Sequence, residues 1–178
     1  MKTAVIYNSQ TGFTKKYAEW ISKAVGADCF ELGTAKRHNF DRYDTIVFGG
    51  WACAGKIHKI SWFKSNMDKW SGKMLIVFCT GGSPAETPEI KTFFSNNFSE
   101  AEQKIVHAFY CPGGFCYEKM PAGSKLMMKM FQKIVGAKKD KTVADIEMLK
   151  MISHSYDISD KKYIEPIIEL LHNTGEGV

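Results

Sequence analysis

The stretch that decides the fold is Lys2-Thr3-Ala4-Val5-Ile6-Tyr7-Asn8-Ser9-Gln10-Thr11-Gly12-Phe13-Thr14. Residues 2–7 form a nearly continuous apolar run with β-branched side chains, which is typical of a strand covered by helices on both faces. A polar turn at residues 8–12 leads into a helix that we expect from about Phe13 to Val25. A strand, a short turn and a helix in this order predict the first unit of an α/β sheet.

The alternation of strands and helices continues along the chain. Further strands are predicted at Cys29–Leu32, Thr45–Gly49, Met74–Cys79 and Lys104–Cys111, and helices at Ile57–Trp70, at Pro88–Phe98, and from Ser159 or Pro166 towards Gly175. This pattern predicts an α/β fold with a five-stranded parallel sheet in the order 2-1-3-4-5. Ligands bind such sheets outside the carboxyl ends of the strands, so the loops at residues 8–14, 50–56 and 80–86 form the candidate site.

Residues 112–155 are more than one strand-to-helix connection requires. They contain predicted helices at Ser124–Val135 and Thr142–Met151. We interpret this stretch as an insertion within a single domain of residues 1–178, because that length suits one domain of ordinary size.

Composition narrows the class of protein. Of the 178 residues, 44% are hydrophobic and 24% are charged, which is close to the average for soluble globular domains. There is no run of about 18 apolar residues and no signal-peptide pattern, so we expect a cytoplasmic protein. The odd number of cysteines, five, and the lack of a secretion signal argue against a disulfide framework. No C-x-x-C pair occurs and the histidines lack metal-ligand spacing, so no metal site is expected.

The turn before the first helix has the chemistry of an anion site. Ser9, Thr11 and Thr14 supply hydroxyl groups, Gly12 lets the backbone close around an oxyanion, and a helix N-terminus adds unpaired amides. Such neutral groups could hold a phosphate without a lysine or arginine. An ordinary Ser/Thr helix cap is the alternative. The sequence matches neither the P-loop nor the G-x-G-x-x-G dinucleotide pattern.

The segment Ser9-x-Thr11-Gly12-x-Thr14 resembles the FMN-phosphate loop of flavodoxins, T/S-x-T-G-x-T after the first strand. The resemblance implies a flavodoxin-like three-layer sandwich with FMN as cofactor and no catalytic side chain. It implies that the phosphate is held by Ser9, Gln10, Thr11, Gly12, Phe13 and Thr14. It also implies that the flavin ring is held by Gly50, Trp51, Ala52, Cys53, Ala54 and Gly55 together with Thr80, Gly81 and Gly82.

Two of these ring contacts carry specific expectations. Trp51 is the candidate for stacking on the flavin, the alternative being that it merely covers the end of the sheet. The family often has an aromatic residue in the third loop, and none occurs at residues 80–84. The resemblance therefore implies a flavin that is open on one side to a bulky partner or substrate.

The insertion resembles one branch of the family. Gly113-Gly114-Phe115-x-Tyr117, followed by a helix rich in lysine and methionine, is similar to the branch that contains menaquinone-dependent protoporphyrinogen IX dehydrogenase. The expected function is electron transfer through FMN to a redox partner protein. The alternative is an FMN-dependent oxidoreductase acting on a quinone or another small molecule.

Two further features leave alternatives open. Lys125, Lys129 and Lys133 form a basic stripe that could contact a membrane surface or an acidic partner, or could simply be the solvated edge of a packed helix. The net charge of +5 does not indicate nucleic-acid binding, because the lysines are spread along the chain. Cys111 and Cys116 could form a reversible disulfide, or the Gly113–Gly114 turn between them could flank the cofactor pocket.

Overall fold

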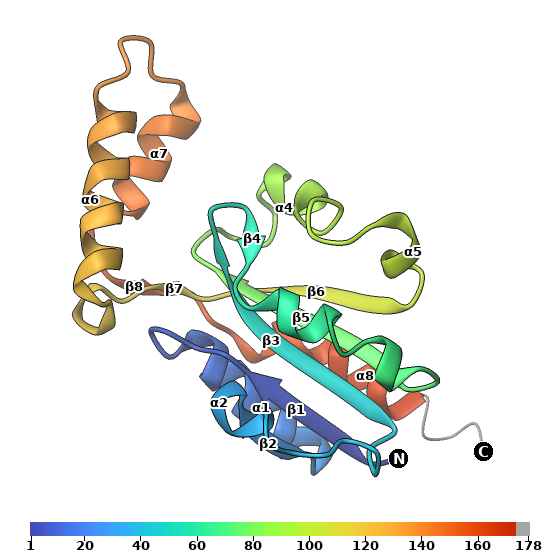
Figure 1. Cartoon of the computed structure of the whole chain (residues 1–178). Helices are drawn as coiled ribbons and strands as arrows, with labels where there is room; N and C mark the ends of the chain where they lie inside the picture. Colours follow the sequence, from blue (N-terminus) through green and yellow to red (C-terminus); the bar gives the residue numbers. More distant parts are fainter. Residues whose placement is uncertain (174–178) are drawn as a thin grey trace.

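A parallel sheet forms the centre of the molecule. The structure, a computed structural model, describes residues 1–173. Five strands lie in the order β2-β1-β3-β5-β6, which confirms the predicted order of the main strands (Figure 1). Their bounds are Asp28–Glu31 for β2, Thr3–Tyr7 for β1, Thr45–Cys53 for β3, Met74–Gly81 for β5 and Val106–Pro112 for β6.

The sheet differs from the prediction at the end of β3, which runs four residues further than expected. Here the two-residue strand β4 (Lys56–Ile57) pairs antiparallel with Ala52 and Cys53. The connecting residues Ala54 and Gly55 have φ angles of 48° and 76°. Two consecutive left-handed residues make the tight turn that matches the twist of a hairpin. The sheet is therefore not purely parallel, because it ends in a small β3–β4 hairpin.

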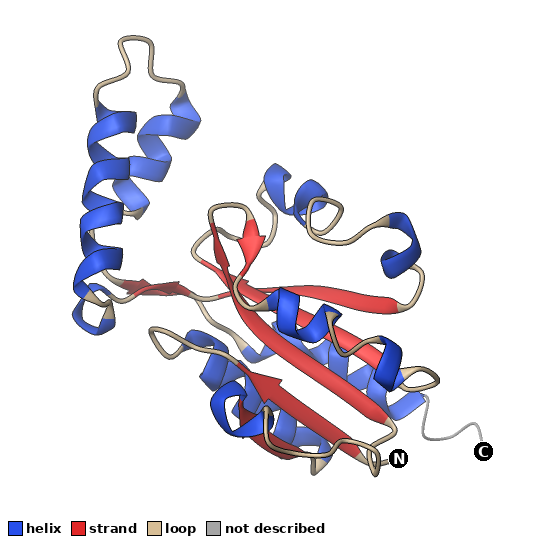
Figure 2. Cartoon of the chain, viewed as in Figure 1, coloured by secondary structure: helices blue, strands red, loops and turns tan. Residues whose placement is uncertain are grey.

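Helices cover both faces, which explains the apolar runs in the strands (Figure 2). Alternate side chains along each strand point to opposite faces. Val5, Val47 and Ile76 pack with α1 (Phe13–Val25) and α8 (Glu165–Asn173). The other face buries side chains that pack with α2 (Leu32–Ala35), α3 (Ile60–Lys64) and the segment holding α4 (Pro88–Phe93) and α5 (Glu100–Gln103); among them are Ile6, Ile46, Phe48, Phe63, Val77 and Phe98.

The long helix predicted at Ile57–Trp70 is wrong. The structure has only α3 and a 3-10 turn, η1 (Asp68–Trp70). The Trp62 carbonyl would accept from the Asn66 amide in a continuing helix, but it accepts from Asn66 Nδ2 at 2.8 Å and Ser65 Oγ at 2.9 Å instead. Side chains that bond nearby carbonyls compete with the helix in this way. The helix predicted at Pro88–Phe98 likewise ends early, at Phe93.

The segment after β6 forms a projecting arm, defined here as residues 114–157. Its base is an antiparallel pair, β7 (Gly114–Phe115) and β8 (Tyr156–Asp157). Between them lie η2 (Tyr117–Lys119), α6 (Ala122–Gly136) and α7 (Val143–Met151), and Figure 1 shows these helices standing clear of the sheet.

The chain returns to the sheet after the arm. A 3-10 turn, η3 (Lys161–Ile164), leads into α8, so Pro166 lies in the first helical turn, where proline is tolerated. The predicted end of this helix near Gly175 lies outside the described residues. Within residues 1–173, no helix is both long and apolar enough to cross a membrane.

Candidate functional site

The N-terminus of α1 presents unpaired amides. Its N-cap residue is Gly12, with φ of 105° and no side-chain cap, so the alternative of a Ser/Thr cap does not hold. Within residues 1–173, the amides of Gln10, Thr11, Phe13 and Thr14 donate to no acceptor. Bare amides at the positive end of a helix dipole bind anions. The donor set therefore fits a phosphate group.

Two threonines expected at the site face each other. Thr14 Oγ1 and Thr80 Oγ1 lie 2.8 Å apart in a buried hydrogen bond, where either atom can donate. Thr14 begins α1 and Thr80 lies near the end of β5. This contact joins the first predicted loop to the third, so the structure brings them together.

His58 joins the first loop to the second. Asn8 Nδ2 donates to His58 Nδ1 at 2.8 Å, and the His58 ring stacks on Trp51 with centroids 3.9 Å apart. Burial, and then the charge of Lys59, lowers the pKa of His58 below its usual 6.5, which favours the neutral ring. One face of Trp51 is thus covered by His58.

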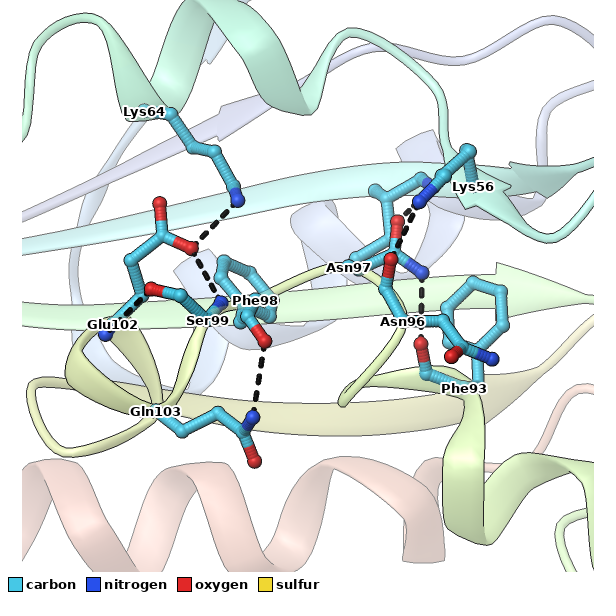
Figure 3. Close-up of polar contacts among 10 residues, drawn as sticks. Lys56, Lys64, Phe93, Asn96, Asn97, Phe98, Ser99, Glu102 and Gln103 are labelled. Carbon is cyan, nitrogen blue, oxygen red and sulfur yellow. Dashed lines mark hydrogen bonds and ion pairs between the residues drawn. The ribbon is translucent and has the colours of Figure 1, made fainter.

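Asn97 fixes the β3–β4 hairpin, and Figure 3 shows its side chain bonded to the Phe93 carbonyl. Its buried side chain accepts from the Ile57 amide at 2.9 Å and donates to the carbonyls of Gly55 at 3.0 Å and Phe93 at 2.8 Å. These hydrogen bonds of Asn97 therefore hold the second predicted loop, residues 50–55, in its hairpin conformation. This role of Asn97 is not recognisable in the sequence, because the contact joins residues some forty positions apart.

Lys64 of α3 and Glu102 of α5 form an ion pair 2.7 Å apart (Figure 3). Burial opposes ionisation of Glu102, but hydrogen bonds from Lys64 and Ser99 outweigh it and hold the pKa of the Glu102 carboxyl below its usual value. The ionised pair fastens α3 to the start of α5.

The third loop is held by the base of the arm. The Gly81 carbonyl accepts from the Gly113 amide at 2.7 Å, and the Gly82 carbonyl accepts from Tyr156 Oη at 2.7 Å. A β-carbon on Gly82 would collide with the Phe115 ring, so only glycine permits this close approach. Burial raises the pKa of Tyr156 to about 12, which keeps its hydroxyl a donor.

Aromatic side chains from the arm thus lie where the third loop has none. The rings of Phe115 and Tyr156 are 5.6 Å apart, and those of Phe115 and Tyr117 are 6.2 Å apart and nearly parallel. The family resemblance in the insertion included Phe115 and Tyr117 but not Tyr156. The sequence did not indicate that these rings pack beside the third loop.

The cysteines are all free. Cys111 is buried with Sγ 3.7 Å from the Tyr163 carbonyl, and burial raises the pKa of its thiol. Cys116 instead lies 3.4 Å from Glu118 Oε2. The Gly113–Gly114 turn lies beside the third loop, as one of the two interpretations expected. Within the described part of the chain, no cluster of three or more His, Cys, Asp or Glu could hold a metal.

The remaining predicted site residues lie on the β3–β4 hairpin. Ala52, Cys53 and Trp51 are half-buried, Ala54 and Gly55 form its exposed turn, and Gly50 is buried against Ile57. The three loops follow β1, β3 and β5, so they meet at one edge of the sheet.

Comparison with known proteins gives a family and several similar folds. A family profile described as "Flavodoxin domain" matches residues 4–142. No curated protein matches the chain. Among solved structures, a flavodoxin, WrbA-like protein from Agrobacterium tumefaciens is 14% identical, with a TM-score of 0.47 and coverage of 85% of this chain and 94% of that one.

Two further solved structures are similar at the same level. A flavoprotein in complex with FMN from Lactobacillus acidophilus is 16% identical, with a TM-score of 0.45 and coverage of 62% of this chain and 91% of that one. Oxidised flavodoxin 2 from Bacillus cereus is 19% identical, with a TM-score of 0.42 and coverage of 62% and 84%.

Proposed function

The chain belongs to the flavodoxin domain family, and from this membership we propose that it binds FMN and transfers electrons through it to or from a redox partner protein. The observation that carries the proposal is the set of bare amides at the N-terminus of α1, capped by Gly12. FMN, when bound, supplies the redox chemistry, while the protein binds, orients and shields it.

Each loop has a distinct role in this proposal. The backbone and hydroxyl groups of residues 9–14 bind the phosphate. Trp51 and the hairpin at residues 50–55 lie along one side of the flavin ring, and Thr80–Gly82 present backbone groups to its edge. Asn97 and Tyr156 hold the two ring-binding loops in place. No side chain is required to move a proton.

An FMN titration tests the proposal. We expect the purified protein to bind FMN, quench its fluorescence and show the absorption bands of an oxidised flavin. Thr11→Glu places a carboxylate beside the phosphate and should weaken FMN binding at least a hundredfold, which corresponds to about 3 kcal/mol. Thr34→Glu adds the same charge on α2, away from the loops, and is the control. Equal FMN affinity in both variants contradicts the proposal.

A second candidate is an FMN-dependent oxidoreductase of the protoporphyrinogen IX dehydrogenase type that passes electrons to a quinone. The aromatic cluster of Phe115, Tyr117 and Tyr156 favours it, because it offers flat, apolar surface beside the ring-binding loop. Oxidation of protoporphyrinogen IX with a quinone acceptor, lost in Phe115→Ser and kept in Phe93→Ser, would support this candidate over a simple carrier.

The arm also suggests where the partner binds. Leu126, Met127, Met130, Phe131 and Ile134 on α6 are 42–64% exposed. They lie on one helix face, next to the row of Lys125, Lys129 and Lys133, and the arm carries eight lysines against five acidic residues. An apolar face flanked by lysines suits an anionic membrane surface, so we extend the proposal to peripheral contact with such a surface.

Free thiols fit the reducing cytoplasm as the compartment.

Vesicle sedimentation tests the membrane contact. Binding is expected to vesicles containing an anionic phospholipid and to fall in vesicles of phosphatidylcholine alone. Ile134→Ser should weaken binding, whereas Ile105→Ser changes an isoleucine of similar exposure outside the arm and should not. Equal binding of both variants and wild type contradicts a role for α6.

A further inference from the structure

The arm places Lys119 beside the N-terminus of α1, where we propose that the phosphate binds. Lys119 is the last residue of η2, at the base of the arm. A β-carbon placed on Gly12 would lie 3.8 Å from Lys119 Nζ, so the ammonium faces the N-cap of α1 directly. The sequence pattern accounts for phosphate binding by amides and hydroxyls alone and gives this lysine no role.

Two positive groups lie close together here, the Lys119 ammonium and the N-terminal end of the α1 dipole. The N-terminus of α1 is the positive end of the helix dipole, where an ammonium is unfavourable. Within residues 1–173, Lys119 Nζ takes part in no ion pair. The neighbouring lysines on α1 are already paired, Lys15 with Glu19 at 3.7 Å and Lys16 with Asp157 at 2.9 Å. An anion between Lys119 and the helix end would satisfy both.

We propose that Lys119 binds the phosphate of FMN, so that the arm contributes directly to cofactor affinity and selects phosphorylated over unphosphorylated flavin. The inference rests on the proposed function. A charged hydrogen bond from an ammonium to phosphate is stronger than a neutral one. Lys119 is exposed, so solvent and salt reduce the gain.

Parallel titrations with FMN and riboflavin test the inference on the full-length protein. Lys119→Gln should weaken FMN binding about tenfold and leave riboflavin binding unchanged, because riboflavin lacks the phosphate. The FMN affinity of the variant should also fall less steeply with salt. Lys119→Arg keeps the charge and should retain most of the affinity. Lys139→Gln, at an exposed lysine on the outer part of the same arm, is the control.

The outcomes distinguish failure of this inference from failure of the proposed function. If wild type binds FMN and Lys119→Gln binds it equally well, the inference is overturned while the proposed function stands. An equal loss for FMN and riboflavin also overturns it, because the effect would then not act through the phosphate. If wild type binds neither flavin, the proposed function fails and the inference fails with it.

Discussion

The buried hydroxyl of Thr45 lowers the free energy of unfolding, because it is removed from water without a hydrogen-bond partner in the described part of the chain. Thr45 is fully buried at the start of β3, and its Oγ1 has no hydrogen-bond partner among residues 1–173. Thr45→Val removes an unpaired hydroxyl and keeps the shape, so the free energy of unfolding should rise by about 1 kcal/mol. Thr80→Val, at a similarly buried threonine bonded to Thr14, should lower it by about 1 kcal/mol. Urea unfolding of the FMN-free protein measures both, and a loss of stability in Thr45→Val contradicts the argument.

His58 makes the fold sensitive to acid. Folding lowers its pKa below the usual 6.5, so the unfolded chain takes up a proton more readily than the folded one. Its contribution is therefore fully present above about pH 6.5 and declines as the pH falls. His58→Gln should lose less stability than wild type between pH 7 and pH 5. A pH response of His58→Gln that matches wild type would show that this ring does not titrate as argued.

At the level of single residues, sequence could predict donors but not their partners. Ser9, Thr11 and Gly12 are recognisable because the spacing of small polar residues before a helix is local. Asn97 and Lys119 are not, because each acts on a loop that is distant in the sequence and nothing nearby marks it.

Among the secondary-structure elements, the β3–β4 hairpin depends most on a single distant side chain. Asn97→Ala removes three hydrogen bonds and leaves the buried Ile57 amide unpaired, so stability should fall by about 2 kcal/mol. Hydrogen exchange at the hairpin amides should accelerate. Asn96→Ala is the matched control, because among the described residues only the backbone of exposed Asn96 is bonded: its amide donates to the Thr92 carbonyl and its carbonyl accepts from Lys56. Unchanged exchange in Asn97→Ala would contradict the role of the side chain.

Strands were easier to predict than helices for a physical reason. Strands buried on both faces need apolar residues at nearly every position, and β1, β3 and β5 show this directly. The face with α2 to α5 is covered by short helices and turns, where local side-chain bonds such as those of Asn66 end the helix. Phe63 and Trp70 are both buried, but they lie in α3 and in the 3-10 turn η1 and not in one long helix.

At the scale of the whole molecule, deleting the arm tests whether the core folds without it. The arm has its own buried residues, Val135 and Ile152, and β7 and β8 enter and leave side by side. Replacing residues 116–155 with Asn-Gly, a favoured two-residue hairpin turn, should leave a cooperatively unfolding core. Circular dichroism during thermal unfolding measures this, and a broad, non-cooperative transition would show that the core needs the arm. Sequence predicted the insertion from its excess length, but no periodic pattern gave its position relative to the sheet.

The position of Lys119 at the root of the arm has a thermodynamic consequence. If Lys119 binds the phosphate as proposed, a shift of that root relative to Gly12 would alter the affinity for FMN. Equilibrium linkage is reciprocal, so cofactor loading would change the arm's affinity for its target by the same factor. The FMN-free and FMN-bound forms of the protein would then differ in their affinity for the target of the arm, although α6 and α7 do not line the cofactor site.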